Sequence, residues 1–192
     1  TIQLMTSPEA GFTYSTISCQ GQPVQFTDQS QAGGGGSIAS WEWNFGDPAS
    51  GTANISTLPN PSHTYASTGI FVVRLIVRNV NNCTDTTTKN IAIHQSPVSN
   101  FITDTACAGN NTSFYDASIA NAESIIAYQW DFGDGAGSSQ MNPVHLYANA
   151  GIYNATLTIT NSNGCVHDTT KEVMVNPLPI AAFTYTSPTC QG

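Results

Sequence analysis

The sequence predicts an all-β protein made of two tandem antiparallel β-sandwiches of the immunoglobulin type, arranged head to tail. Three observations indicate this fold: short stretches in which apolar and polar residues alternate, Gly, Asn and Pro turns between them, and a motif that occurs twice. Alternation with a period of two is typical of strands with one buried face. About seven such strands in each repeat fit an immunoglobulin-like sandwich.

The clearest strands lie late in each repeat. Residues 71–78 and 153–160 alternate strictly, so one face of each is expected to be buried and the other wet. Residues 24–27 predict a shorter strand near the start of the first repeat, and Thr-rich segments that end at 91–93 and 173–175 predict the last strand of each. No stretch has helical periodicity longer than one turn.

Composition excludes several classes of function. Only 8% of the 192 residues are charged, the net charge is −8, and there are four Lys and Arg residues in all. Nucleic-acid binding needs clustered cations that displace counterions, so it is excluded. An anionic membrane surface is disfavoured for the same reason, and no apolar run is long enough for a spanning helix, so we expect no membrane insertion.

An aromatic motif at the end of a strand occurs in both halves, as Trp43–Pro48 and Trp130–Gly135. Its aromatic residues alternate and run into a Gly-Asp turn. We expect them to fill the sandwich core rather than to form a platform that stacks on sugars. The structural positions of the motif are Trp43, Phe45, Asp47, Tyr65, Trp130, Phe132, Asp134 and Tyr147.

Repeated spacing sets the predicted domain bounds. An aliphatic residue, a Pro, a Phe and a Cys recur in this order three times along the chain, beginning at Leu4, Ile93 and Val175, and the first two steps are four residues in each copy. We therefore expect the last strand of an upstream repeat at 1–7, whole repeats at 8–95 and 96–178, and the opening of a downstream repeat at 179–192. Such a chain would be a segment of a longer array.

Both repeats resemble the PKD (polycystic kidney disease) domain. The resemblance rests on Trp130–Gly135, Asn142–Tyr147 and Gly151–Tyr153, and on Asn60–Tyr65 and Gly69–Phe71 in the first repeat. It implies a seven-stranded sandwich that serves as an extracellular spacer or interaction module, as in bacterial surface proteins and secreted hydrolases. It does not imply catalysis.

The first repeat departs from the PKD pattern at two positions. Asn44 and Pro48 stand where the family usually has Asp and Gly, so the turn of the first repeat is expected to differ from that of the second.

Carboxylates in the two turns are the candidate metal ligands. Asp47, Asp131 and Asp134 are weak candidates for calcium, because Ca²⁺ needs six or more oxygens. We expect these side chains to accept backbone N–H groups in the turns instead, and we expect no metal or other cofactor. His63 and His145 occupy equivalent places without another ligand at zinc spacing, so a packing or turn role is expected.

The cysteines predict disulfides and hence an oxidising, extracellular setting. In each repeat one Cys precedes the second strand (Cys19, Cys107, Cys190) and one follows the sixth (Cys83, Cys165). Pairing within a repeat is the obvious arrangement, but these positions lie at opposite ends of strands about 25 Å long. We therefore predict a bond between repeats, Cys19–Cys165, while Cys83, Cys107 and Cys190 pair with neighbouring repeats. A distorted sandwich would favour pairing within each repeat.

The leading interpretation is a non-catalytic stalk of a large extracellular bacterial adhesin, fibre or surface appendage, stiffened by disulfides. The alternative is a carbohydrate-binding or spacer module of a secreted polysaccharide hydrolase or protease. The sequence has no catalytic motif, so we expect no enzyme activity. The expected partners are neighbouring repeats of the chain, a second copy in a homo-oligomer or filament, and a surface glycan or protein bound elsewhere in the full protein.

Overall fold

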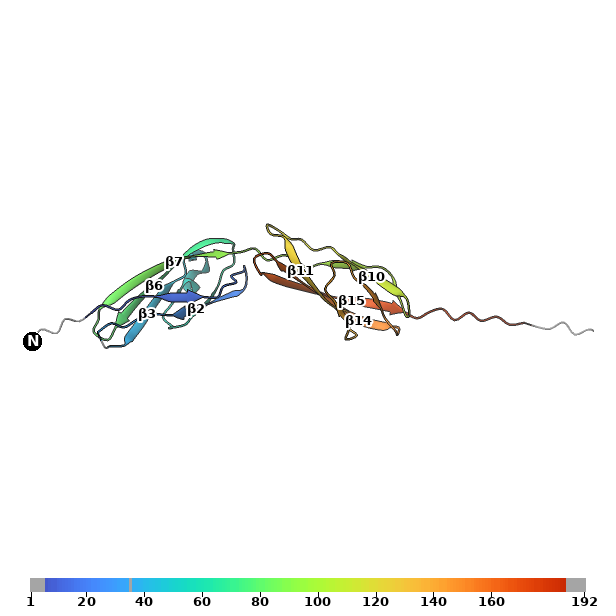
Figure 1. Cartoon of the computed structure of the whole chain (residues 1–192), viewed down its shortest axis with the longest axis horizontal. Helices are drawn as coiled ribbons and strands as arrows, with labels where there is room; N and C mark the ends of the chain where they lie inside the picture. The colour runs from blue at the N-terminus through green and yellow to red at the C-terminus, as the bar shows by residue number, and fades with distance from the viewer. Residues whose placement is uncertain (1–5, 35, 186–192) are drawn as a thin grey trace, which may run out of the picture. The chain divides into compact units, whose positions relative to one another are not determined.

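The computed structural model describes residues 6–34 and 36–185 (Figure 1). Contacts between Cα atoms group the chain into two compact units. The first unit comprises the residues up to Val98 together with 119–126 and 159–167, and the second comprises 99–118, 127–158 and the residues from 168 onward. Cys190, most of the predicted 1–7 strand and the end of the 179–192 segment lie outside the described residues.

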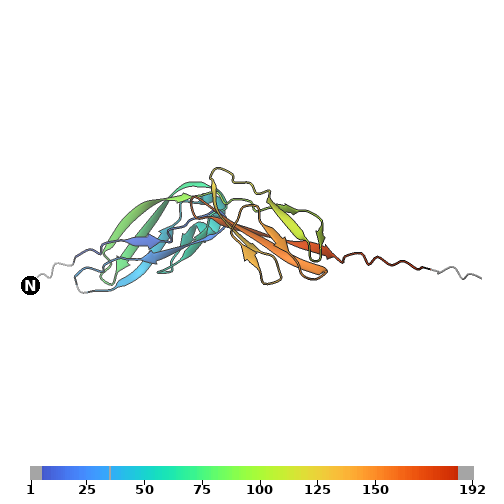
Figure 2. The same cartoon turned by 45° about the vertical axis from the view of Figure 1, so that its right-hand side comes forward.

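Strands β1–β7 form the first repeat. One sheet has the order β1-β2-β5, from β1 (Phe12–Tyr14), β2 (Pro23–Asp28) and β5 (Ser62–Thr64). The other has the order β4-β3-β6-β7, from β3 (Ile38–Asn44), β4 (Ile55–Ser56), β6 (Gly69–Asn79) and β7 (Thr84–Ile93). Every pair is antiparallel, and β6 and β7 form a long hairpin, green in Figures 1 and 2.

Strands β8–β15 form the second repeat. One sheet has the order β13-β10-β8, from β8 (Phe101–Thr103), β10 (Asn111–Asp116) and β13 (Val144–Leu146). The other has the order β12-β11-β14-β15-β9, from β9 (Ala106–Cys107), β11 (Ile125–Asp131), β12 (Gly137–Ser138), β14 (Gly151–Asn161) and β15 (Val166–Asn176). The short β9 lies parallel to the end of β15. In the first repeat a single bridge between Cys19 and His94 takes its place.

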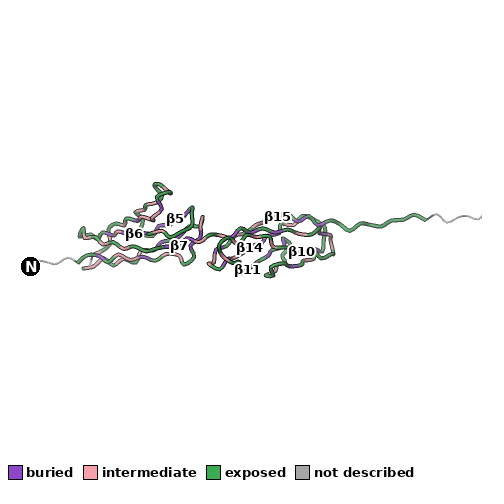
Figure 3. The backbone as a smooth tube through the Cα atoms, turned by 90° about the horizontal axis from the view of Figure 1, so that it is seen from above, coloured by how far each residue is buried: buried purple, intermediate pink, exposed green. Residues whose placement is uncertain are grey.

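The core of the first repeat lies between its two sheets. Phe12 and Phe26 come from the first sheet, whereas Trp43, Leu75 and Ile91 come from the second, and all are buried in one cluster. Buried residues alternate with exposed or half-buried ones along β6 and with half-buried ones along β14 (Figure 3). Each fully buried large apolar side chain contributes about 1.5–3 kcal/mol of transfer free energy. The predicted all-β sandwich class is confirmed for both repeats.

The loop after the aromatic motif differs between the repeats, as the residue at Pro48 led us to expect. In the first repeat a short 3-10 helix, η1 (Pro48–Asn54), follows Asp47 and leads into β4. In the second repeat the chain turns within a few residues from β11 into β12. The start of the turn is nevertheless shared, because Asn44 Oδ1 accepts the N–H of Gly46 as Asp131 Oδ1 accepts that of Gly133.

Candidate functional site

The motif tryptophans are buried core residues in both repeats. Trp43 and Trp130 are each 2% exposed, and their indole N–H groups donate to the carbonyl oxygens of Leu58 and Gln140 at 2.9 and 2.8 Å. A sugar could not reach these rings without opening the core. The motif therefore supplies no aromatic binding platform at these positions.

A histidine–aspartate pair lies beside the aromatic motif of the first repeat. His63 Nε2 and Asp47 Oδ2 are 3.0 Å apart. The His63 ring stacks on Phe45 at 4.5 Å between centroids and meets Tyr65 edge-on at 4.5 Å. The Tyr65 hydroxyl donates to the Phe45 carbonyl at 3.0 Å. The His63 imidazole thus joins strand β5, on which it lies, to the turn after β3, which carries Asp47.

The second repeat contains the same arrangement. His145 Nε2 and Asp134 Oδ2 are 2.7 Å apart, and the imidazole stacks on Phe132 at 4.2 Å. The Tyr147 hydroxyl donates to the Phe132 carbonyl at 3.0 Å. Asp134 also accepts the backbone N–H of Ala136 through Oδ1 at 3.1 Å, which is the turn role expected of such a residue.

The electrostatics of these pairs fit a structural role. Burial, reinforced by the nearby Asp47 charge, raises the pKa of Tyr65, and burial together with Asp134 does the same for the pKa of Tyr147. Burial works against ionisation of Asp134, but the hydrogen bonds from His145 and Ala136 outweigh it and lower the pKa of that carboxyl. Both tyrosines are neutral donors, and Asp134 is an anion that is already bonded.

The three candidate calcium ligands already have hydrogen-bond partners within the chain. Asp47 and Asp134 bond histidines, and Asp131 accepts the N–H of Gly133. Within residues 6–34 and 36–185, no three His, Cys, Asp or Glu side chains are grouped to hold a metal ion.

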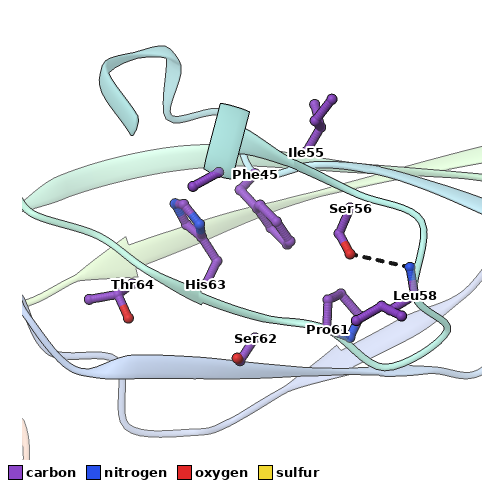
Figure 4. A pocket seen from close by; sticks show the side chains of 9 residues that line it. Phe45, Ile55, Ser56, Leu58, Pro61, Ser62, His63 and Thr64 are labelled. Carbon is purple, nitrogen blue, oxygen red and sulfur yellow. Dashed lines mark hydrogen bonds between the residues drawn. The ribbon is translucent and has the colours of Figure 1, made fainter. Parts of the chain in front are cut away.

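The first repeat also has a pocket that is lined in part by His63 (Figure 4). Phe45, His63, Ile55 and Leu58 line it, together with small polar residues, and Ser56 Oγ accepts the N–H of Leu58 at 3.2 Å. Among the residues that line it, the titratable group is His63, whose Nε2 is occupied by Asp47. A catalytic site needs a nucleophile with an activating base beside it, or a second acid–base group within reach, and His63 is the one titratable residue among those that line this pocket.

A disulfide joins Cys19 to Cys165, with their Cα atoms 5.7 Å apart. Both cysteines belong to the first compact unit, where the turn at 159–167 packs with the residues before Val98. Asn163 Nδ2 lies 2.8 Å from His94 Nδ1 in the same unit. Gly164 lies against Ile17, because a Cβ at position 164 would be 3.1 Å from Ile17 Cδ1.

Pairing within the first repeat is excluded by strand length. Cys19 bridges His94, directly after β7 ends, whereas Cys83 directly precedes β7. A strand of 10 residues spans about 33 Å at about 3.3 Å per residue, while a disulfide needs Cα atoms within about 7 Å. Among the described residues, Cys83 and Cys107 are the cysteines outside a disulfide, and both are half-buried.

The hydrogen bond between histidine and aspartate was not predicted from the sequence. Both histidines were expected to have a packing or turn role, which fits their stacking but omits the hydrogen bond. A signal was present: in each repeat the Asp follows the motif Phe by two residues, and the His precedes the Tyr by two. Strand alternation then puts His and Tyr on one face, next to the Phe.

Comparison with protein families identifies the family to which the chain belongs. The PKD domain model matches residues 5–93 and 94–176, so the chain belongs to the PKD family and carries two such domains in tandem. PKD domains are non-catalytic accessory domains, and the match confirms the expectation that this chain is not an enzyme.

Several curated relatives are bacterial collagenases and metalloproteases. A collagenase, ColA, of Clostridium perfringens is 28% identical over 59% of this chain, and the pre-pro-metalloprotease PrtV of Vibrio cholerae is 35% identical over 52%. In each case the match covers 10% of the relative's length. The PKD1 domain of Vibrio anguillarum Epp is a solved structure that is 34% identical to this chain. It matches 44% of this chain and 98% of its own, with a TM-score of 0.42.

No helix in the described part of the chain is both long and apolar enough to cross a membrane.

Proposed function

We propose that this chain is a non-catalytic spacer of an extracellular bacterial protein, and that the Cys19–Cys165 bond limits movement between successive PKD domains. One observation carries the proposal: the disulfide joins a residue of the first matched domain to a residue of the second. A covalent link in addition to the peptide linker removes conformations that a simple linker would allow. The repeat bounds 8–95 and 96–178 and the extracellular location stay predictions that accompany this proposal.

The chemistry around the bond supports the same role. Asn161 Oδ1 accepts the N–H groups of Asn163 and Cys165 at 3.1 and 2.9 Å, so the turn that carries Cys165 is fixed by a side chain rather than left loose. Asn161 Nδ2 also donates to the carbonyl of Gln95, which lies between strands β7 and β8, at 3.0 Å. One asparagine thus connects the cysteine turn with the segment that joins the two repeats.

The test is rotational diffusion measured by NMR relaxation on the intact chain and on Cys165→Ser. We expect the amides of the two domains to report one common tumbling time in the native chain. In the variant, or after reduction, they should report two shorter times. The matched control is Cys83→Ser, which removes a thiol that is not in a disulfide and should leave the tumbling unchanged. Separate tumbling of the domains in the oxidised native chain would refute the proposal.

Two kinds of full-length protein are candidates to contain such a spacer. The collagenase and metalloprotease relatives favour an accessory segment of a secreted protease or polysaccharide hydrolase over the stalk of an adhesin or fibre. Burial of Trp43 and Trp130 disfavours carbohydrate binding through the motif. Co-sedimentation with insoluble collagen and with cellulose separates the roles: a pure spacer stays in the supernatant with both, whereas an accessory binding module pellets with one of them.

A further inference from the structure

Two half-sites recur in this chain, and one copy of each is bonded. The first half-site, which we name the cysteine loop, comprises residues 17–22 and 105–110 around Cys19 and Cys107. The second, the asparagine turn, comprises residues 79–83 and 161–165 and ends in Cys83 and Cys165. Among the described residues, the Cys19 loop is bonded to the 161–165 turn, whereas Cys107 and Cys83 are outside a disulfide.

The two cysteine loops have the same backbone structure. Residue 20 donates its N–H to the carbonyl of His94 at 2.9 Å, as residue 108 does to Asn176 at 2.9 Å. The next amide donates to the carbonyl of a motif tyrosine, Tyr65 or Tyr147, at 2.9 or 2.8 Å. Each cysteine carbonyl then accepts the amide three residues later, at 3.1 Å in both repeats. Cys107 is therefore presented by its own domain as Cys19 is.

The two asparagine turns also match. Asn79 Oδ1 accepts the N–H groups of Asn81 and Cys83, both at 3.0 Å, as Asn161 does for Asn163 and Cys165. The other side of each amide binds the segment that leads into its domain. Asn79 Nδ2 donates to the Thr6 carbonyl at 3.3 Å, and Asn161 Nδ2 donates to that of Gln95 at 3.0 Å. In both repeats, the segment that leads into the repeat is therefore hydrogen-bonded to the asparagine turn of that same repeat.

The side chains at the junction vary in a complementary way. In the bonded junction a large Ile17 faces Gly164, which has no side chain. In the unbonded half-sites the corresponding residues are Thr105, which is smaller, and Asn82, which is larger and has a φ of 64° in the left-handed region. In the bonded junction His94 contacts Asn163. The corresponding residues of the unbonded half-sites are Asn176 and Asn81, so both positions remain polar.

We propose that the Cys107 loop and the 79–83 turn are complementary docking half-sites, and that each takes another repeat of this same kind through a Cys107–Cys83 type of disulfide. This inference rests on the proposed spacer function and extends it to a ladder of bonds along an array. In the isolated chain the partner of each half-site is a second copy.

Bond formation uses a small-molecule disulfide such as oxidised glutathione as the oxidant. The Cys107 thiolate attacks one glutathione sulfur, and one glutathione thiolate leaves. The Cys83 thiolate of the second copy then attacks Cys107 Sγ in the mixed disulfide, and the second glutathione leaves. The two protons of the cysteine thiols end on the two glutathione thiols, so the protein pair loses two electrons that the oxidant gains.

The experiment mixes two variants that each keep one half-site. One is Cys83→Ser with Cys190→Ser and retains the Cys107 thiol; the other is Cys107→Ser with Cys190→Ser and retains Cys83. In a reduced and oxidised glutathione buffer, we expect the mixed dimer to exceed each like-with-like dimer by about tenfold, because docking raises the local thiol concentration. Adding Asn79→Ala to the second variant keeps the Cys83 thiol but removes the side chain that holds the asparagine turn. This change should abolish the excess of the mixed dimer.

Non-reducing gels give the dimer yields, and peptide mapping identifies the bonds. Dimers in random proportions would overturn the proposal, as would an unchanged preference after Asn79→Ala. The same digest reports the Cys19–Cys165 peptide. If the Cys19–Cys165 peptide is present and the dimers are random, only the docking half-sites are refuted. If the Cys19–Cys165 peptide is absent, the proposed spacer function is refuted as well.

Discussion

The two repeats bury the same histidine–aspartate pair to different depths. In the first, the side chains of His63 and Asp47 are 3% and 6% exposed, whereas those of His145 and Asp134 are 13% and 23% exposed. The stacking of the imidazole on the motif Phe and its edge contact with the Tyr are nevertheless nearly the same. The aromatic side chains therefore give both pairs nearly the same geometry, although the exposure of the pairs differs.

A second difference lies in the core itself. Val24 is buried on β2, and the equivalent position on β10 is Thr112, which is also fully buried. Among the described residues, Thr112 Oγ1 is the buried side-chain polar atom without a hydrogen-bond partner. The second repeat thus carries a polar defect that the first lacks at this position, and each repeat serves as a natural reference for the other.

The largest effect is expected where the two repeats do not differ, at the glycine after the motif Phe. A Cβ on Gly133 would lie 2.6 Å from the Asn154 carbonyl oxygen, at a φ of +80°. Gly133→Ala should cost about 3 kcal/mol of unfolding free energy, since a backbone clash adds to the left-handed strain. Gly46→Ala should cost as much, because its Cβ would be 2.6 Å from the Val72 carbonyl oxygen. Chemical denaturation monitored by circular dichroism measures both.

The matched control is Gly135→Ala. Gly135 has a φ of +91°, and no neighbouring atom lies within 4 Å of the position that its Cβ would occupy. Its replacement should therefore cost only the conformational strain of about 1–2 kcal/mol. Equal losses at positions 133 and 135 would show that close approach of the backbone adds nothing to the cost.

The second prediction separates the two histidine–aspartate pairs. Double-mutant cycles with alanine at each partner cancel the lost ring packing and leave the coupling between the side chains. We expect a coupling of about 1–3 kcal/mol for Asp47 and His63, because the pair is shielded from water. For Asp134 and His145 we expect less than about 1 kcal/mol, because partly exposed pairs are screened.

Native-state hydrogen exchange of the amides in each repeat supplies these free energies, since it resolves the repeats within one chain. A coupling in the second repeat as large as that in the first would show that exposure of the pair has no influence on its strength.

The smallest expected effect is a gain in stability. Thr112→Val removes the unpaired hydroxyl while keeping the shape of the side chain, and it should stabilise the second repeat by about 1 kcal/mol. The reverse change in the first repeat, Val24→Thr, should cost about 1 kcal/mol or more. Thermal unfolding followed by calorimetry checks both variants. A loss of stability in Thr112→Val would mean that the hydroxyl makes a bond in solution.

Strand alternation made most of the fold predictable. The residues buried on β6 and β14, such as Leu75 and Leu157, are those that alternation placed on the inner face. The edge bridge of Cys19 with His94 was not predictable in this way, because a single parallel pair leaves no periodicity to read. The 3-10 helix at Pro48–Asn54 was missed for a similar reason, since one short turn has no repeat of its own.

The candidate sites were less accessible to sequence reasoning than the strands. Repetition of Asp47 and His63 as Asp134 and His145 marked these residues, but only the packed structure brings strand β5 and the motif turn to hydrogen-bonding distance. The role of Asn161 as a cap of the cysteine turn was equally hidden, because Asn is common throughout this chain. By contrast, regular cysteine spacing and strand length sufficed to propose the partner of Cys19.

The long loop closed by Cys19 and Cys165 has a consequence for survival among proteases. The bond joins residues separated by 146 positions, a span that contains most of the first domain and most of the second. Cleavage of any single peptide bond between them opens the loop but leaves both pieces covalently attached. A nick near Gln95 would therefore not release the downstream piece, so the segment keeps its continuity until a second cut or a reductant intervenes.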